Sequence, residues 1–259
     1  MPLLFWEQKA GDVRIDAVDM AMLSPSWHRP GLHDRIRFHS GVPLESLPFD
    51  DGTFDLVVSQ YGIEYADRSK AIAECARVAA EGASVALVMH HVGSVLVAVG
   101  REELGHKERL LAPVGLLASA RTVLPWIAHA RDGQALGESA NRARARYNKA
   151  MQDVGEAIAT SPAPDLLLEA RANVHAVLSG VDSRSLAAAS RALDAYAAQL
   201  EAARLRTSEM VASALDRSGL EAMASALRAA LPRHRIECGE LAQAEGVLGW
   251  TMVAAPAVG

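Results

Sequence analysis

The first 95 residues alternate between strand-like and helix-like patterns of hydrophobic positions. Strands are predicted at 12–19, 35–42, 54–59 and 84–89, and the last two are compact apolar runs typical of strands buried on both faces. Between them, apolar residues recur at helical spacing from Asp67, a plausible N-cap, to Ala80, and Gly82 is expected to end that helix. Strands separated by helices predict right-handed crossovers and a parallel sheet.

From residue 96 to about residue 231 the pattern is mostly helical. Leu186, Leu193 and Leu200 recur every seven residues and predict one long amphipathic helix over about 183–215. We expect this leucine stripe to pack against the chain's own helices, with a coiled-coil partner helix as the alternative. Helix breaks are expected at Gly133, 161–164, Gly180 and Gly219.

The chain ends with a return to strand patterns. Residues 235–241 and 249–254 flank a turn around Gly246 and predict an antiparallel hairpin that closes the sheet. The chain therefore divides into an α/β core over 1–95, a helical insertion over 96–206, and a last helix and hairpin over 207–259.

Composition narrows the class of protein. Half of the 259 residues are hydrophobic, enough for a sizeable core, and a net charge of −5 argues against a nucleic-acid binder held by phosphate contacts. Two cysteines, Cys75 and Cys238, exclude a disulfide scaffold and a cysteine-rich zinc site, and we expect both to be buried thiols. The alternate arginines at 142, 144 and 146 are expected on a solvated surface.

Local sequence patterns also predict the cellular location of the protein. The N-terminus shows no signal-peptide pattern, so a cytoplasmic protein is expected. The most apolar long stretch, 110–129, is interrupted by Pro113, Arg121 and Pro125, and predicts a buried or partly buried helix rather than a membrane span.

Ligands of open α/β sheets bind at the carboxyl ends of the strands. The residues found there are Asp19 and Met20, Val42 and Pro43, Ser59 to Tyr61, and His90 and His91. An acidic residue in the position of Asp19 can bind both hydroxyls of a ribose, although strands also end in aspartate simply to start a turn. His90 or His91 is a weak candidate for a general base near neutral pH.

Other constellations of catalytic or metal-binding residues do not stand out. No Ser-His-Asp order and no metal-ligand spacing is recognisable, so no metal is expected. His28, His33 and His39 surround a loop that contains proline and are expected to be surface residues.

The most informative segment is LPFDDGTFDLVVSQYGIEY, residues 47–65. It resembles the class I S-adenosylmethionine-dependent methyltransferases, in particular the methyltransferase-11-like small-molecule group, in which a loop reading LPF.DG.FD leads into a strand. The similarity continues through RVAAEGASVALVMHH, residues 77–91, and includes GWTMVA as the last strand, so that it covers about 12–95 and 207–255. The matching loop positions are Leu47, Pro48, Phe49, Asp51, Gly52, Phe54 and Asp55.

The resemblance implies a Rossmann-like methyltransferase sheet and S-adenosylmethionine as the cofactor. It assigns the ribose to Asp19 and places Met20 on the adenine, while Ser59 and Gln60 line the methionine side and Tyr61 lines the reaction cleft. Val42, Pro43 and Leu44 would border the adenine. Plainer readings stay open, since Val42 and Leu44 also fit core positions and Ser59 also fits a cap at the end of the strand. Pro43 cannot bond the adenine amine as an acidic residue would.

One departure from the family concerns the glycine-rich loop that follows its first strand. No such loop precedes the 12–19 strand, and Leu3 to Lys9 reads as the end of the helix that follows the loop. We therefore expect the central first strand to be missing from this chain. A late start-codon assignment, a truncated gene product and a strand supplied by another chain are three explanations.

The favoured function is methyl transfer from S-adenosylmethionine to a small-molecule acceptor that the sequence does not name. The alternative is a non-catalytic, truncated methyltransferase-like protein whose helical insertion binds a protein partner. A nicotinamide-dependent oxidoreductase is a third hypothesis, and the LPFDDGTFD loop speaks against it. A homo-oligomer formed through the insertion stays open, and methyl transfer often needs only alignment and desolvation of its reactants.

Overall fold

The computed structural model describes residues 13–244 and 246–257, which fall into two compact units. The first unit comprises residues 1–94 and 213–259, and the second comprises 95–212. The segment 3–9, for which the sequence predicts the end of a helix, lies outside the described residues, as does whatever precedes the first strand.

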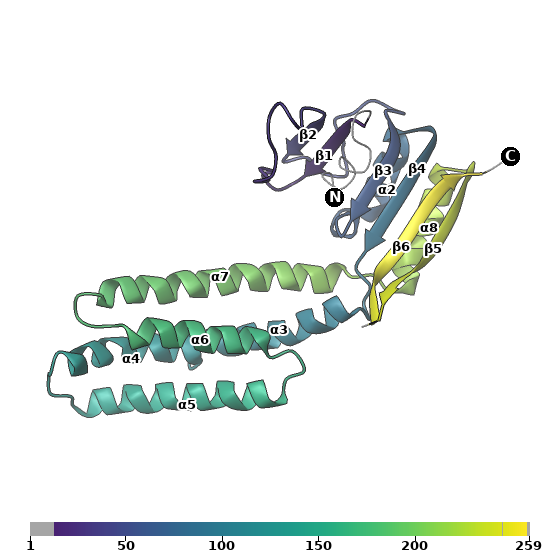
Figure 1. The fold of residues 1–259 in the computed structure, drawn as a ribbon. Helices are drawn as coiled ribbons and strands as arrows, with labels where there is room; N and C mark the ends of the chain where they lie inside the picture. Colours follow the sequence, from purple (N-terminus) through teal and green to yellow (C-terminus); the bar gives the residue numbers. More distant parts are fainter. Residues whose placement is uncertain (1–12, 245, 258–259) are drawn as a thin grey trace. The chain divides into compact units, whose positions relative to one another are not determined.

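The first unit is an α/β domain with a C-terminal hairpin, as the sequence predicts (Figure 1). One sheet pairs β1 with β2 in parallel, and the other has the order β3-β4-β6-β5, with β3 and β4 parallel and the remaining pairs antiparallel. The elements are β1 (Ile15–Asp19), β2 (Ile36–Ser40), β3 (Phe54–Gln60), the 3-10 helix η1 (Ile63–Tyr65), α2 (Arg68–Val78), β4 (Ala79–Met89), α8 (Arg217–Ala230), β5 (His234–Gln243) and β6 (Gly246–Pro256).

Two parallel strands of this unit keep an open edge. Within residues 13–244 and 246–257, β1 pairs only with β2, and β3 pairs only with β4. The side chain of Phe49 bridges this region, since its ring lies edge-on to His39 of β2 at 5.2 Å and to Phe54 of β3 at 4.9 Å. The open edges leave backbone donors and acceptors of β1 and β3 without a ladder partner among the described strands.

The core of the first unit lies between the four-stranded sheet and the helices α2 and α8. Ile72 of α2 and Leu227 of α8 are almost fully buried, as are the alternate β4 residues Val85, Leu87 and Met89. Alternate side chains of a strand point to the same face of the sheet, so every second residue of β4 enters the core.

The end of α2 differs from the sequence prediction. The helix ends at Val78, and Ala79 already pairs with Phe54 as the first residue of β4. The register then shifts so that Ser84 lies opposite Leu56, and Gly82 has a φ of +87° in the bulging segment between. Gly82 therefore serves a bulge in the strand and not a helix end, because pairing with β3 starts earlier than the local pattern shows.

Burial of β3 also differs from the prediction. This strand was expected to be buried on both faces, yet Leu56 is 44% exposed and Val57 and Val58 are only half-buried. Among the described residues β3 is the edge strand of its sheet, which explains why its apolar side chains are incompletely covered. Cys75 is buried as expected, and burial raises the pKa of its thiol to about 11, whereas Cys238 on the other edge strand, β5, is exposed.

The histidines around the β1–β2 connection are not all surface residues, contrary to the expectation. His33 is buried and packs edge-on against Trp27, with ring centroids 5.6 Å apart, while His28 lies 5.2 Å from Phe38. His39 pairs with Asp16 across β1 and β2 at 2.8 Å. An aromatic cluster thus forms a small core beneath the connection.

The second unit consists of helices, as predicted for the insertion. They are α3 (Val95–Leu111), α4 (Leu116–Arg131), α5 (Glu138–Thr160), α6 (Asp165–Ser179) and α7 (Leu186–Ser213). Leu193 and Leu200 are buried in the core of this unit and Leu186 packs against it, so the leucine stripe faces the chain's own helices as expected. The predicted break at Gly219 is wrong: the chain leaves α7 after Ser213, and Gly219 lies in the first turn of α8, where its N–H bonds to Asp216.

Helices α3 and α7 approach closely in the second unit. A Cβ atom on Gly100 would lie 2.4 Å from the Cε of Met210, so any larger residue there would require the end of the Met210 side chain to move. Lys107 is buried in the same interface and donates to Glu103 at 2.7 Å and to the hydroxyl of Thr207 at 2.9 Å. The alternate arginines at 142, 144 and 146 are exposed, as expected for a solvated face.

One described stretch, Val95–Arg131, is long and apolar enough to cross a membrane by length and composition, with a mean hydropathy of 1.5 in its most apolar window. Of that window, 39% is buried inside the unit. The stretch is not one helix, because α3 and α4 are separated by a turn at 112–115 and Pro125 lies within α4. Such a stretch is weak evidence for a span, since core helices of globular proteins meet the same criteria.

Candidate functional site

Asp19 lies at the carboxyl end of β1, where its backbone and side chain organise the turn. Its carbonyl accepts the N–H of Val42 at 3.1 Å, and its Oδ1 accepts the N–H of Ala21 at 2.8 Å. The residue is exposed, so its carboxylate also faces solvent. Asp19 therefore closes a turn, as the plainer reading holds, and still presents a charged acceptor at a strand end.

The neighbouring candidates differ in how far they are exposed. Met20 is 65% exposed and Pro43 is exposed, while Val42 is half-buried. Leu44 packs against the core of the first unit, which supports the plainer reading of that residue. The bond between Val42 and Asp19 brings the ends of β1 and β2 together, so these two positions share one edge of the sheet.

Ser59 and Gln60 end β3. The hydroxyl of Ser59 accepts the N–H of Ile63 at 3.1 Å and so fixes the start of η1, whereas Gln60 is exposed. Gly62 is placed so that a Cβ would lie 3.3 Å from this hydroxyl. The structure thus gives Ser59 a capping contact, and that contact determines where Glu64 of η1 lies.

Tyr61 follows in a left-handed conformation with a φ of +53°, the only described non-glycine residue with a positive φ. Its N–H donates to the carbonyl of Val88 at 2.7 Å, and its ring packs against Gly249, where a Cβ would lie 2.6 Å from the carbonyl of Met89. Burial raises the pKa of Tyr61, and the charge of Glu64 adds to this. Strained backbone of this kind is concentrated at functional sites.

His90, at the end of β4, forms a buried pair with Glu64. The Nδ1 atom of His90 lies 2.7 Å from Oε1 of Glu64, and the backbone N–H of His90 donates to the same oxygen at 2.9 Å. The Glu64 side chain is 0% exposed and the His90 side chain 8% exposed. The rings of Tyr61 and Tyr65 flank the imidazole at 4.4 and 6.0 Å.

His91 has a different environment. Its Nδ1 accepts the N–H of Gly93 at 2.7 Å, its ring stacks on Trp250 at 4.3 Å, and its Nε2 lies 3.8 Å from Glu240. The accepting Nδ1 places the ring proton on Nε2, so neutral His91 presents a donor there. Of the two candidate histidines, only His90 has a buried carboxylate on its Nδ1.

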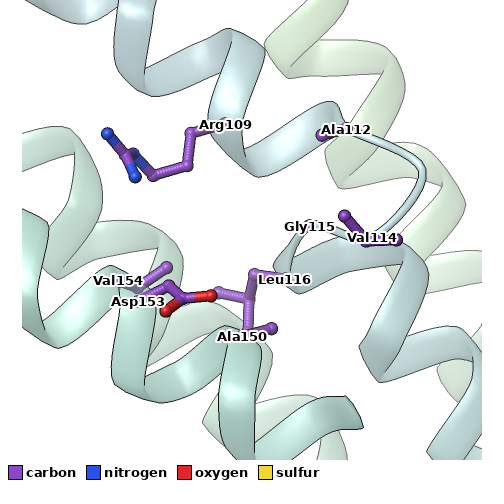
Figure 2. A pocket seen from close by; sticks show the side chains of 8 residues that line it. All are labelled: Arg109, Ala112, Val114, Gly115, Leu116, Ala150, Asp153 and Val154. Atoms are coloured by element: carbon purple, nitrogen blue, oxygen red, sulfur yellow. The ribbon is translucent and has the colours of Figure 1, made fainter.

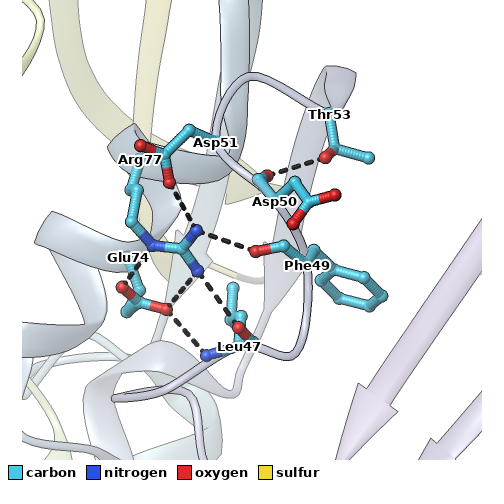
Figure 3. A network of polar contacts seen from close by, with 7 residues as sticks. All are labelled: Leu47, Phe49, Asp50, Asp51, Thr53, Glu74 and Arg77. Atoms are coloured by element: carbon cyan, nitrogen blue, oxygen red, sulfur yellow. Dashed lines mark hydrogen bonds and ion pairs between the residues drawn. The ribbon is translucent and has the colours of Figure 1, made fainter.

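The LPFDDGTFD loop is held by Arg77 of α2 (Figure 3). The guanidinium group donates to the carbonyls of Leu47 and Phe49, to Asp51 and twice to Glu74, at 2.7–3.0 Å, and so uses all five of its N–H donors. Glu74 in turn accepts the N–H of Leu47 at 2.7 Å. The motif that is most distinctive in the sequence is therefore structural, since it fixes the loop that enters β3.

Acidification should weaken this network, because hydrogen bonds from Arg77 lower the pKa of Glu74 to about 2. Because the pKa of Glu74 is lower in the folded protein than its ordinary value of 4.5, the ionised carboxylate stabilises the fold at pH values above about 4.5. This contribution is lost as the pH falls from 4.5 toward 2. Glu74→Gln should therefore have a lower Tm than the parent at pH 7, with the difference shrinking near pH 2.5. Thermal melts across pH test this, with the 87% exposed Glu81→Gln as control; a constant difference would contradict it.

A small cavity of about 140 Å³ lies in the second unit, next to the turn between α3 and α4 (Figure 2). Arg109 and Asp153 are its charged lining residues, and Asp153 is already paired with Lys149. Cavities that bind drug-sized ligands have about 300–1,000 Å³, so this one is too small for a nucleoside cofactor. Among the described residues, no group of three or more His, Cys, Asp or Glu side chains is placed to hold a metal ion.

Comparison with known proteins finds a family match for part of the first unit. Residues 13–87 match the family model described as "Methyltransferase domain". Over these residues the chain is similar to methyltransferase domains. The match covers β1, β2, β3, the loop held by Arg77 and all but the last two residues of β4, so His90 and His91 lie just beyond it.

Two curated relatives are similar to part of the chain. The chain is 37% identical over 86 residues to ajmaline N-methyltransferase and 43% identical over 61 residues to norajmaline N-methyltransferase, both from Rauvolfia serpentina. These matches cover 33% and 23% of this chain and 29% and 20% of the relatives, so the chain matches less than a third of their length.

Solved structures are similar over different extents. The YcgJ protein of Bacillus subtilis is 34% identical over 31% of this chain and 33% of its own, with a TM-score of 0.22. A protein assigned as a sarcosine dimethylglycine methyltransferase from Galdieria sulphuraria is 13% identical over 97% of this chain and 73% of its own, with a TM-score of 0.32.

The residue of this site that the sequence patterns do not point to is Glu64. It lies in the quoted segment 47–65, but an acidic residue in a short turn carries no signal of burial. Its position 26 residues before His90 gives no hint of contact either. Only the crossover through α2, which brings β3 and β4 side by side, makes them neighbours.

Proposed function

We propose that this methyltransferase domain transfers a methyl group from S-adenosylmethionine to a small-molecule acceptor. The observation that carries the proposal is the position of Asp19, Val42 and Gln60 at or just after the carboxyl ends of β1, β2 and β3, within the segment that matches the methyltransferase family. His90 follows β4 just beyond that segment. The curated relatives methylate nitrogen according to their names, which makes an amine the first acceptor class to test.

The chemistry of the strand ends fits the adenosine part of the cofactor. Asp19 offers an exposed carboxylate that can accept hydrogen bonds from ribose hydroxyls, and the half-buried Val42 offers an apolar surface on the adjacent loop. Gln60 is exposed at the end of β3, where its amide can donate and accept. When bound, S-adenosylmethionine would supply the electrophilic methyl group.

The alternative of a non-catalytic protein depends on the helical unit. The leucine stripe is already occupied within that unit, because Leu193 and Leu200 are buried in its core and Leu186 packs against that core. The stripe therefore gives no support to a partner-binding surface. Cofactor binding separates the two hypotheses, because a partner-binding remnant has no need of a ribose site.

The ribose role of Asp19 predicts that Asp19→Ala weakens the binding of S-adenosylhomocysteine by about 1.5–3 kcal/mol, the contribution of a hydrogen bond to a charged group. That is roughly a 10- to 100-fold increase in Kd. Isothermal titration calorimetry, or ligand-observed NMR where binding is weak, measures it.

Two variants make this prediction specific. Asp19→Asn keeps an acceptor for the N–H of Ala21 but removes the negative charge, so it distinguishes loss of the turn from loss of the carboxylate. Asp50→Ala is the control, because it removes an exposed carboxylate elsewhere in the same unit. Equal affinities of the parent and Asp19→Ala would exclude the ribose role.

A further inference from the structure

The pair formed by Glu64 and His90 has a geometry that the fold alone does not require. Oε1 of Glu64 accepts both the backbone N–H and the Nδ1–H of His90, at 2.9 and 2.7 Å. Because this oxygen already accepts one N–H, it is the acceptor toward the ring as well, and the ring proton lies on Nδ1. Neutral His90 therefore carries its free lone pair on Nε2.

The burial of Glu64 is costly. Its side chain is 0% exposed, and its second oxygen, Oε2, is buried without a hydrogen-bond partner in the described structure. A buried acceptor that is left unpaired opposes folding, so its retention calls for a function. The neighbouring Tyr61, with its positive φ, is a second unfavourable feature in contact with the same imidazole.

The backbone of His90 is fixed on its other side too. Its carbonyl accepts the N–H of Leu215 at 2.8 Å, and the carbonyl of Leu215 accepts the indole N–H of Trp250 at 2.9 Å. The ring of Tyr61 lies tilted against the imidazole at 4.4 Å and the ring of Tyr65 lies edge-on to it at 6.0 Å, so the imidazole has little freedom to rotate. A general base needs such a fixed orientation.

We propose that His90 takes the proton of the methyl acceptor through Nε2 and that Glu64 is the positioning residue that holds His90 in this tautomer. The inference rests on the proposed function. In the step, the lone pair of an amine or hydroxyl acceptor forms the bond to the methyl carbon and the C–S bond breaks with its electron pair staying on sulfur. The acceptor's N–H or O–H proton passes to Nε2, and S-adenosylhomocysteine is the second product.

This assignment restricts the substrate class. An acceptor whose nucleophile carries a proton, such as a secondary amine or a phenol, benefits from His90, whereas a tertiary amine has no proton to lose. The negative charge of Glu64 stabilises the imidazolium that results, as the buried aspartate stabilises the histidine of a Ser-His-Asp triad.

The first test reads the tautomer and needs no cofactor. Long-range ¹H–¹⁵N spectra of histidine-labelled protein at pH 8 should show His90 protonated on Nδ1 in the parent and in Glu64→Gln, whose amide oxygen still accepts. In Glu64→Val the proton should move to Nε2. Assignment comes from His90→Asn, and a parent protonated on Nε2 would overturn the proposal.

The second test uses radiolabelled S-adenosylmethionine with tetrahydroisoquinoline and phenol as probe acceptors. His90→Asn should lower kcat about 100-fold or more at pH 7, with the KM for S-adenosylmethionine unchanged, and its rate should keep rising with pH because only the deprotonated acceptor then reacts. Glu64→Val should act in the same direction and Glu64→Gln should recover part of the rate. Glu237→Gln, an exposed carboxylate, is the control.

The outcomes separate this inference from the proposed function. Parent-like kcat and pH profile in His90→Asn would overturn the base role while methyl transfer itself stands. Absence of both cofactor binding and transfer in the parent would instead contradict the proposed function, and the base role with it. Circular dichroism of each variant establishes that it is folded before either assay.

Discussion

Replacing Leu193 by alanine is expected to lower the free energy of unfolding of the helical unit by about 2–5 kcal/mol, the range for truncating a buried leucine. Leu193 is only 1% exposed and lies in the core that α4, α5, α6 and α7 share. The cost arises from lost apolar contacts and from the cavity that remains. Chemical denaturation followed by circular dichroism measures it.

The same helix provides a matched control. Leu205 is 59% exposed on α7, so Leu205→Ala should change stability by less than about 0.5 kcal/mol. If Leu193→Ala unfolded like the parent while a dimer or a co-purifying partner was lost, the leucine stripe would be an interface and the interpretation given above would be wrong.

Arg77→Lys is expected to lower the Tm of the first unit by roughly 5–10 °C, although the charge is kept. Lysine has three donors on one atom and cannot reproduce the five bonds that the planar guanidinium makes to the loop and to Glu74. The carbonyls of Leu47 and Phe49 would lose a donor, and the loop that leads into β3 would lose its attachment to α2.

A second arginine in the same unit serves as the comparison. Arg233 pairs with Glu81, but both side chains are more than 80% exposed, so Arg233→Lys should leave the Tm almost unchanged. Equal shifts for the two variants would mean that the charge, and not the fork geometry of Arg77, stabilises the loop.

Much of the fold could be predicted from local patterns. The apolar run 54–59 became β3 and the heptad leucines of 183–215 became α7, because side-chain periodicity within one element depends on that element alone. The end of α2 could not be predicted in this way. Gly82 looks like a helix end, but Ala79 pairs with Phe54, which lies 25 residues earlier in the sequence, and this pairing starts the strand before Gly82.

The candidate site, too, was predictable from the sequence only in part. Local patterns show which residues follow each strand, and this is enough to select Asp19, Gln60 and His90 as candidates. The pairing of Glu64 with His90 and the bonds from Arg77 to the LPFDDGTFD loop arise only in the folded chain. These contacts join residues 26–30 positions apart, and they depend on strand register and on the path of α2, which no local pattern encodes.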